Sequence, residues 1–136
     1  MTDRAENRRP RAEEAAKRKP DPRSVGRWGE REAAAWLRKR GWRILERNFT
    51  CRFGEIDIVA EDAGCLVFVE VKLRRSAEYA LAREAVTPGK QQKLIRAAEY
   101  YLSRRDPDMP VRFDVIEVYG ESGRVDAVNH IENAFQ

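Results

Sequence analysis

The sequence is poor in the residues that zinc sites and nucleophilic triads require. Of its 136 residues, two are cysteine and one is histidine. Cys51 and Cys65 stand alone without a CxxC pair, which argues against a structural zinc site. His130 has no second histidine to act with, so histidine-based metal sites and Ser-His-Asp chemistry are poor candidates. We therefore expect His130 to be an ordinary surface or core residue.

Long apolar segments are also missing. No apolar run approaches the roughly 20 residues that span a bilayer. The chain does not begin with the charged and then apolar segment of a secretory signal. Two isolated cysteines in a chain without an export signal are typical of a reducing compartment. These absences predict a cytoplasmic protein that has no membrane partner.

The excess of positive charge is small and is concentrated at one end. The chain has 27 basic and 23 acidic residues, a net charge of +4, and residues 1–24 hold eight of the basic and five of the acidic ones. Residues 1–23 also contain three prolines and almost no large apolar side chains, so we expect a disordered basic tail. The tail is either an arm that touches phosphates or a solvated segment without a role. Residues 24–136 are expected to form a single domain that is almost neutral.

Hydrophobic periodicity predicts two helices and five strands. The first helix covers residues 24–40, with Ser24 as its N-cap and Gly41 as its end. The second helix covers residues 88–105, because Pro88 fits the first turn of a helix. The strands are expected at residues 42–49, 52–61, 65–73, 111–119 and 124–131.

The third strand is expected at the centre of the sheet. Residues 66–69 are apolar on both faces, which is typical of a strand covered on both sides. The segment 74–86 is ambiguous between a loop and a loop that carries a short helix. The order α-β-β-β-α-β-β therefore predicts an α/β fold, a three-layer sandwich whose mixed central sheet is flanked by helices.

Charged residues interrupt the segments that otherwise read as buried structure. Asp57 lies in the second strand, and Glu70 and Lys72 share one face of the third. On the first helix, Glu30 points within about 20° of Leu37 on the apolar face. Burying a charge costs several kcal/mol unless the charge is paired or bound to a metal. The pattern therefore favours a cation site.

Oxygen ligands without histidine or cysteine suit Mg²⁺ or Mn²⁺. We expect Asp57, Glu70 and Glu30 to be the metal ligands, with Lys72 orienting a water molecule or offsetting charge on phosphorus. A tight turn over residues 62–64 would place Asp57 opposite Val69, and a shift of one residue would bring Asp57 and Glu70 onto the same face.

A purely structural interpretation is also open. Glu70 and Lys72 could form a surface ion pair worth about 0–1 kcal/mol. Asp57 could pair with Arg74, and Glu30 with a basic residue at the edge of its helix. The residues alone do not decide between this interpretation and a metal site.

Several short motifs occur together in a specific order. They are Gly29-Glu30, residues 41–48, Gly54-Glu55-Ile56-Asp57, residues 67–72, Lys90 and Arg112-Phe113-Asp114. With these motifs, residues 24–131 resemble the YraN-like family of uncharacterised bacterial proteins. Members of that family look like the restriction-endonuclease-like superfamily, the PD-(D/E)XK nucleases.

The resemblance implies a role for each site residue. Asp57, Glu70 and Lys72 match the acidic pair and the lysine of the superfamily, with Ile56 standing where the motif has proline. Glu30 matches the first-helix acidic residue of members similar to Holliday-junction resolvases. Lys90 and Gln91 fall where some members place a polar residue from the following helix.

The leading interpretation is a metal-dependent nuclease. It would hydrolyse phosphodiester bonds in nucleic acid, in DNA rather than RNA, and its substrates could include branched or damaged structures. Asp57, Glu70, Lys72 and Glu30 would be catalytic, and the nucleic acid would contact Lys90, Gln91, Arg74 and Arg75. The alternatives are a non-catalytic nucleic-acid-binding module and a protein-interaction module such as a homodimer. For the last, Trp28 and Tyr100 leave the apolar helix faces, and exposed aromatic residues are enriched in interfaces.

Overall fold

The computed structural model describes residues 22–74, 86–105, 108–121 and 123–135. The predicted tail, except for its last two residues, and most of the ambiguous segment 74–86 lie outside this part of the chain. Arg75 lies outside it as well. Within the described residues, no helix is both long enough and apolar enough to cross a membrane.

The described chain contains two helices and five strands in the predicted order. The helices are α2 (Pro22–Lys39) and α4 (Pro88–Ser103). The strands are β1 (Arg43–Cys51), β2 (Gly54–Asp62), β3 (Cys65–Arg74), β4 (Val111–Glu121) and β5 (Arg124–Phe135). Most predicted boundaries agree to within two residues, but β5 continues four residues beyond its predicted end at Ile131.

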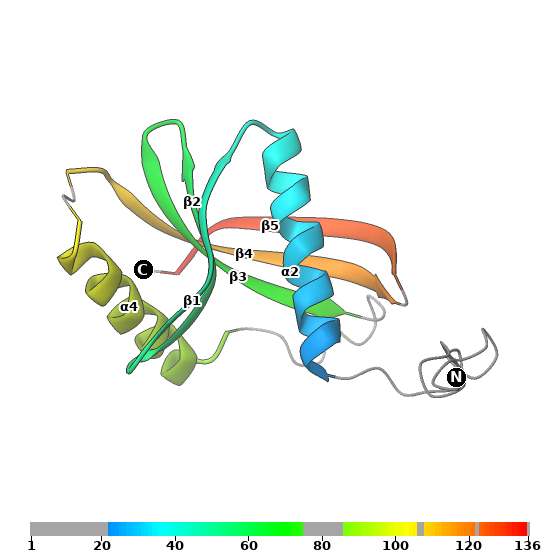
Figure 1. Ribbon diagram of the computed structural model, residues 1–136, viewed down its shortest axis with the longest axis horizontal. Helices are drawn as coiled ribbons and strands as arrows, with labels where there is room; N and C mark the ends of the chain where they lie inside the picture. The colour runs from blue at the N-terminus through cyan, green and yellow to red at the C-terminus, as the bar shows by residue number, and fades with distance from the viewer. Residues whose placement is uncertain (1–21, 75–85, 106–107, 122, 136) are drawn as a thin grey trace, which may run out of the picture.

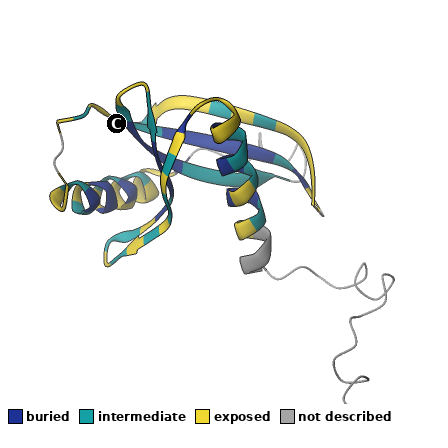
Figure 2. Cartoon of the chain, turned by 45° about the horizontal axis from the view of Figure 1, so that its top comes forward, coloured by how far each residue is buried: buried dark blue, intermediate teal, exposed yellow. Residues whose placement is uncertain are grey.

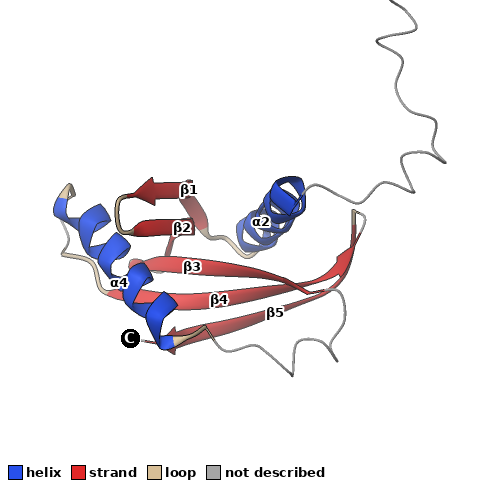
Figure 3. Ribbon diagram, turned by 90° about the horizontal axis from the view of Figure 1, so that it is seen from below, coloured by secondary structure: helices blue, strands red, loops and turns tan. Residues whose placement is uncertain are grey.

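The strands form one mixed sheet with the spatial order β1-β2-β3-β4-β5. β3 and β4 are parallel and are joined through α4, whereas the other neighbouring strands are antiparallel. β3 is therefore the central strand, as predicted. Figure 1 shows α2 crossing the sheet and α4 lying beside the β1–β2 hairpin, and Figure 3 shows the five strands in order.

Two apolar clusters cover the two faces of the sheet. Val67 and Val69 pack in a cluster with Ala33, Ala34 and Leu37 of α2. The alternate residues of β3, Leu66 and Phe68, pack in a second cluster with residues of α4. Side chains alternate between the faces of a strand, so β3 is buried on both sides. This arrangement is consistent with the predicted three-layer α/β sandwich, and Figure 2 shows the buried residues along β3 and β4 and on the inner side of α4.

The ends of both helices follow from their sequences. The Trp42 amide donates to the Leu37 carbonyl at 3.1 Å and the Gly41 amide to the Arg38 carbonyl at 3.0 Å, the pair of bonds that defines a Schellman motif. Thr87 caps α4, because its side chain accepts from the Lys90 amide at 3.3 Å. The prediction that Ser24 is an N-cap is wrong, since α2 begins at Pro22 and proline is well tolerated in a first helical turn.

The turn between β2 and β3 sets the register of the site. It has two residues, Ala63 and Gly64, with φ of 48° and 80°, and Asp62 pairs with Cys65. Positive φ at both positions is the requirement of a type I′ turn. The prediction of a three-residue turn is therefore wrong. The register moves by one residue, and the last pair is Ile58 with Val69 instead of Asp57 with Val69.

Gly120 is the most constrained position of the β4–β5 hairpin. The register of the two strands shifts between Tyr119 and Gly120. Gly120 has a φ of 154°, and a Cβ atom there would overlap the carbonyl oxygen of Arg124 and lie 3.1 Å from Val125 Cα. Backbone atoms cannot rotate away as the end of a side chain can, so only glycine fits.

We predict that Gly120→Ala lowers the free energy of unfolding by more than about 2 kcal/mol, because both the backbone angle and the overlap oppose a side chain. Chemical denaturation measures the change. Gly26→Ala is the matched control, since Gly26 is exposed in α2 and nothing lies within 4 Å of its added Cβ. That substitution should stabilise by about 0.5–1 kcal/mol. Equal effects of the two substitutions would contradict the role given to Gly120.

Candidate metal centre

The candidate site lies next to the point where the regular pairing of β2 with β3 ends. Regular pairing of the two strands ends at Ile58 and Val69. One residue further along β3 from Glu70, the Val71 amide donates to Asp57 Oδ2 at 2.8 Å. A side-chain carboxylate thus accepts the amide proton that a backbone carbonyl would accept in a continued ladder. This bond fixes Asp57 beside Glu70 at the point where the strands separate.

Three carboxylates from two elements converge at this point. Glu30 on α2 and Glu55 and Asp57 on β2 each place one oxygen within 4.8 Å of the other two. Glu55 and Asp57 are two residues apart on a strand and therefore share a face. Opposite ligands of an octahedral Mg²⁺ lie about 4.2 Å apart. Three oxygens this close together are near enough for modest side-chain movement to bring them around one ion.

Glu30 is the most confined of these carboxylates. Its side chain lies on the inner face of α2, as its helical position predicts, and the residue is 8% exposed. Glu30 Oε2 is buried and has no hydrogen-bond partner among the described residues. A buried oxygen without a donor costs about 1–3 kcal/mol or more for a charged group. A cation would satisfy this oxygen, so the donor set fits a hard divalent ion.

The electrostatics of the site favour protonation when no cation is bound. Burial, then the charge of Glu70, raises the pKa of Asp57 to about 8, against the opposing bond from the Val71 amide. Burial also raises the pKa of Glu70, although the charges of Lys72 and Lys90 oppose this shift. Carboxylates that repel one another in a buried place bind either protons or a cation.

The predicted ligand set and the observed group overlap but are not the same. Asp57 and Glu30 belong to both. Glu55 completes the observed group, and Glu70 lies beside Asp57 with its Oε1 3.6 Å from Lys72 Nζ. The Glu70–Lys72 ion pair of the structural interpretation is therefore present, but with side chains 19% and 18% exposed it is half-buried instead of lying on the surface.

Glu55 is the carboxylate that sequence reasoning missed. Its signal was present, because a residue two positions from Asp57 on a strand must point the same way.

The structure describes three of the four residues predicted to contact nucleic acid, namely Lys90, Gln91 and Arg74. Lys90 is exposed, and its charge acts on Glu70. Gln91 Nε2 donates to the Val86 carbonyl at 2.8 Å, which ties this side chain to the start of α4. Arg74 Nε lies 3.6 Å from Glu117 Oε2 on β4. Arg75 is outside the described residues.

A second buried acid, Asp114 on β4, was also missed. Its carboxylate is fully buried and accepts from Arg112 Nε at 2.8 Å and from the Asn133 amide at 2.9 Å. His130 Nε2 lies 2.7 Å from the same carboxylate. Burial alone would raise the pKa of Asp114, but the bonds from His130 and Arg112 outweigh it and lower the pKa. Asp114 therefore joins β5 to β4, and the lone histidine has a structural partner.

We predict that Asp57→Asn stabilises the metal-free protein more at pH 8.5 than at pH 5.5, by about 1–3 kcal/mol. The pKa of Asp57 is raised from 3.8 to about 8. The folded state therefore holds a proton that the unfolded state has lost, and its stability falls as pH rises through this range. Asparagine removes the dependence and keeps an oxygen for the Val71 amide. Denaturation at both pH values in EDTA measures the difference, and the same gain at both would contradict the raised pKa.

Comparison with known proteins places the chain in a family. The model of a family described as "Uncharacterised protein family UPF0102" matches residues 29–118. A UPF0102 protein of Syntrophomonas wolfei is 48% identical over 83% of this chain and 98% of its own length. A relative from Caldanaerobacter subterraneus is 45% identical over 87% of this chain and 99% of its own length. One from Geobacter sulfurreducens is 48% identical over 82% of this chain and 88% of its own length. The resemblance found in the sequence motifs is thereby confirmed at the level of the family: the chain belongs to uncharacterised protein family UPF0102.

Proposed function

We propose that this chain is a metal-dependent nuclease that hydrolyses phosphodiester bonds in DNA. The observation that carries the proposal is the group of three carboxylates near the end of the β2–β3 pairing, in which Glu30 is buried, Asp57 is half-buried and Glu55 is exposed, with a lysine 3.6 Å from the neighbouring Glu70. A fold that required only stability would have apolar side chains there, because buried acids oppose folding. The motifs shared with PD-(D/E)XK nucleases support the same conclusion, and so does the α-β-β-β-α-β-β order, which suits a restriction-endonuclease-like fold.

Each side chain has a distinct part in the proposed reaction. Glu30, Glu55 and Asp57 would hold Mg²⁺ or Mn²⁺, since all three offer only oxygen. A bound ion of this kind polarises a phosphate group and lowers the pKa of a water molecule next to it. The Asp57 carboxylate is kept in place by the Val71 amide, so it does not have to reorganise when charge develops.

Glu70 and Lys72 lie next to the carboxylate group. The ammonium of Lys72 would offset the negative charge that develops on the phosphate oxygens as the bond breaks. Glu70 is near enough to Asp57 to raise its pKa, so its carboxylate would serve as a further ligand or as the acceptor of a proton from the attacking water. The half-buried position of both side chains strengthens these interactions by limiting the access of water.

We predict that the purified protein cleaves at least one DNA in a panel of branched, single-stranded and duplex substrates with Mn²⁺. Asp57→Asn, Glu70→Gln and Lys72→Ala should each lower the rate at least about 100-fold, because each removes charge that acts on the phosphate. Glu61→Gln is the matched control on the same strand and should keep the wild-type rate. Cleavage by Asp57→Asn at the wild-type rate, or no cleavage of any substrate, would refute the proposal.

We also predict that calorimetric titration with Mn²⁺ detects one site, and that Glu30→Gln and Glu55→Gln each weaken it at least about tenfold. The physical reason is the loss of one charged oxygen from the group of three. Glu61→Gln should bind as the wild type does. If Glu55→Gln has no effect while Glu70→Gln abolishes binding, the ligands are instead Asp57, Glu70 and Glu30.

A further inference from the structure

A surface of arginine and aromatic side chains lies beside the metal centre. Arg52 and Phe53 form the two-residue turn between β1 and β2, because Cys51 pairs with Gly54. Tyr100, on α4, has its ring centroid 6.1 Å from that of Phe53. Arg104 follows one turn later, at the end of the same helix. These four residues, Arg52, Phe53, Tyr100 and Arg104, are named here the stacking surface.

Each ring of the stacking surface carries a guanidinium group. Arg52 Cζ lies 4.7 Å from the centroid of Phe53, and Arg104 Cζ lies 5.3 Å from the centroid of Tyr100. Both arginines are exposed, and neither forms an ion pair with a carboxylate of the described chain. The rings are half-buried, so they are accessible from one side. Exposed cations beside half-buried aromatic rings suit a ligand that is both flat and anionic.

The rings are supported from below by the core. Phe49 lies between them and the interior, with its centroid 6.3 Å from Tyr100 and 5.1 Å from Tyr101. Tyr101 is 2% exposed and packs at 5.7 Å against Phe68 of the central strand. The surface is therefore a rigid platform, in which little side-chain entropy would be lost on binding.

The platform is close to the candidate metal centre along the β1–β2 hairpin. Phe53 precedes Glu55 by two residues on the same hairpin, and at 3.3 Å per residue the span from Phe53 to Asp57 is at most about 13 Å. This is roughly four stacked nucleotides. Gly54 packs against α4, where an added Cβ would lie 3.7 Å from Lys93 Cβ. Lys93 and, one turn earlier, Lys90 thus lie on the helix between the platform and Glu70.

We propose that the stacking surface binds unpaired nucleotides of a single-stranded or frayed nucleic acid and leads their backbone to the metal centre. Bases would stack on Phe53 and Tyr100, and Arg52, Arg104 and Lys93 would contact phosphates. The inference names the substrate class of the proposed nuclease and rests on that function for the cleavage step alone. Binding is a separate property of the surface.

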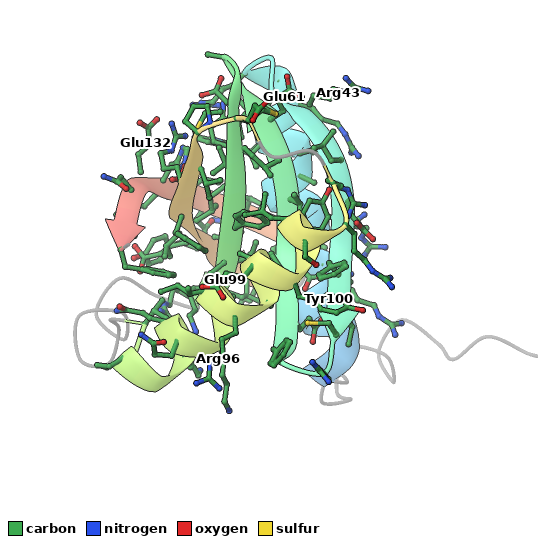
Figure 4. The ribbon with its side chains drawn as sticks, turned by 90° about the vertical axis from the view of Figure 1, so that its left-hand side faces the viewer. Arg43, Glu61, Arg96, Glu99, Tyr100 and Glu132 are labelled. Atoms are coloured by element: carbon green, nitrogen blue, oxygen red, sulfur yellow. The ribbon has the colours of Figure 1, made fainter. Side chains whose placement is uncertain are left out.

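The chemistry of the surface favours a single strand over a duplex. In a duplex the faces of the bases are stacked on one another and cannot meet an aromatic ring, whereas every unpaired base presents such a face. Tyr100 points from α4 toward the hairpin, while the neighbouring Glu99 points away from the hairpin (Figure 4). The acidic side chain is therefore kept away from the proposed path of the phosphates.

The test measures binding without cleavage. A fluorescein-labelled 15-nucleotide oligothymidine and a labelled 15-base-pair duplex are titrated with protein in EDTA, and anisotropy gives both affinities. We predict that the wild type binds the single strand at least about tenfold more tightly. The double variant Phe53→Leu with Tyr100→Leu keeps apolar volume but removes both rings, and it should lose about 5- to 100-fold in single-strand affinity.

Matched variants separate stacking from charge and from misfolding. Phe53→Tyr with Tyr100→Phe keeps both rings and should bind within about twofold of the wild type. Arg43→Ala removes a cation at the far end of β1 (Figure 4) and should also have little effect. Calorimetry with Mn²⁺ checks that the leucine variant retains its metal site. If the strand binds through the rings but no substrate is cleaved, the stacking surface stands and the nuclease function fails.

Three outcomes would overturn the inference. The first is equal affinity for the single strand and the duplex, and the second is wild-type affinity of the leucine variant. The third is the absence of strand binding; if sedimentation then shows a dimer that the leucine variant dissociates, the surface is an interface between two copies of this chain. None of these outcomes bears on the metal centre, which the Mn²⁺ titration and the cleavage assay test separately.

Discussion

The hydrogen bond from the Val71 amide to the Asp57 carboxylate is the constraint on which the site depends. It stands at the place where β2 stops pairing with β3, at a distance of 2.8 Å. With this bond, one strand can turn away from its neighbour without leaving a buried amide unsatisfied. Near this point Glu30 of α2 places an oxygen within 4.8 Å of oxygens of Glu55 and Asp57, and the charge of Glu70 acts on Asp57. The Asp57 side chain thus both satisfies the Val71 amide at the end of the β2–β3 pairing and takes part in the carboxylate group.

The apolar surroundings give this arrangement its electrostatic character. Ile58 and Val69, the last regular pair, are fully buried, and Glu30 shares its helix face with Leu37. Partial burial of Asp57 and the charge of the neighbouring Glu70 raise the pKa of Asp57. Without a metal, the acidic groups of the site lower the free energy of unfolding. Burial of the apolar clusters on both faces of the sheet offsets this loss.

Local signals in the sequence predicted the elements, and long-range geometry limited the prediction of the site. Gly41 and Pro88 act on their own helices, so the boundaries near them were predictable. The register was misjudged because it depends on whether the turn at Ala63 has two or three residues, which composition does not decide. Glu55 could have been found from strand alternation alone. Two partners of Asp114, His130 and Asn133, lie sixteen and nineteen residues away on another strand, and no local pattern indicates them.

The bonds of Asp114 bear on where the folding unit ends. The family model covers residues 29–118, and β5 (Arg124–Phe135) lies wholly beyond it. Yet Asp114, inside the matched region, is held by His130 and Asn133 of that strand. A chain truncated at the family limit would keep a buried anion, lose two of its donors and expose the edge of β4. The donors of Asp114 therefore link the region that the family model matches to a strand that lies outside that region.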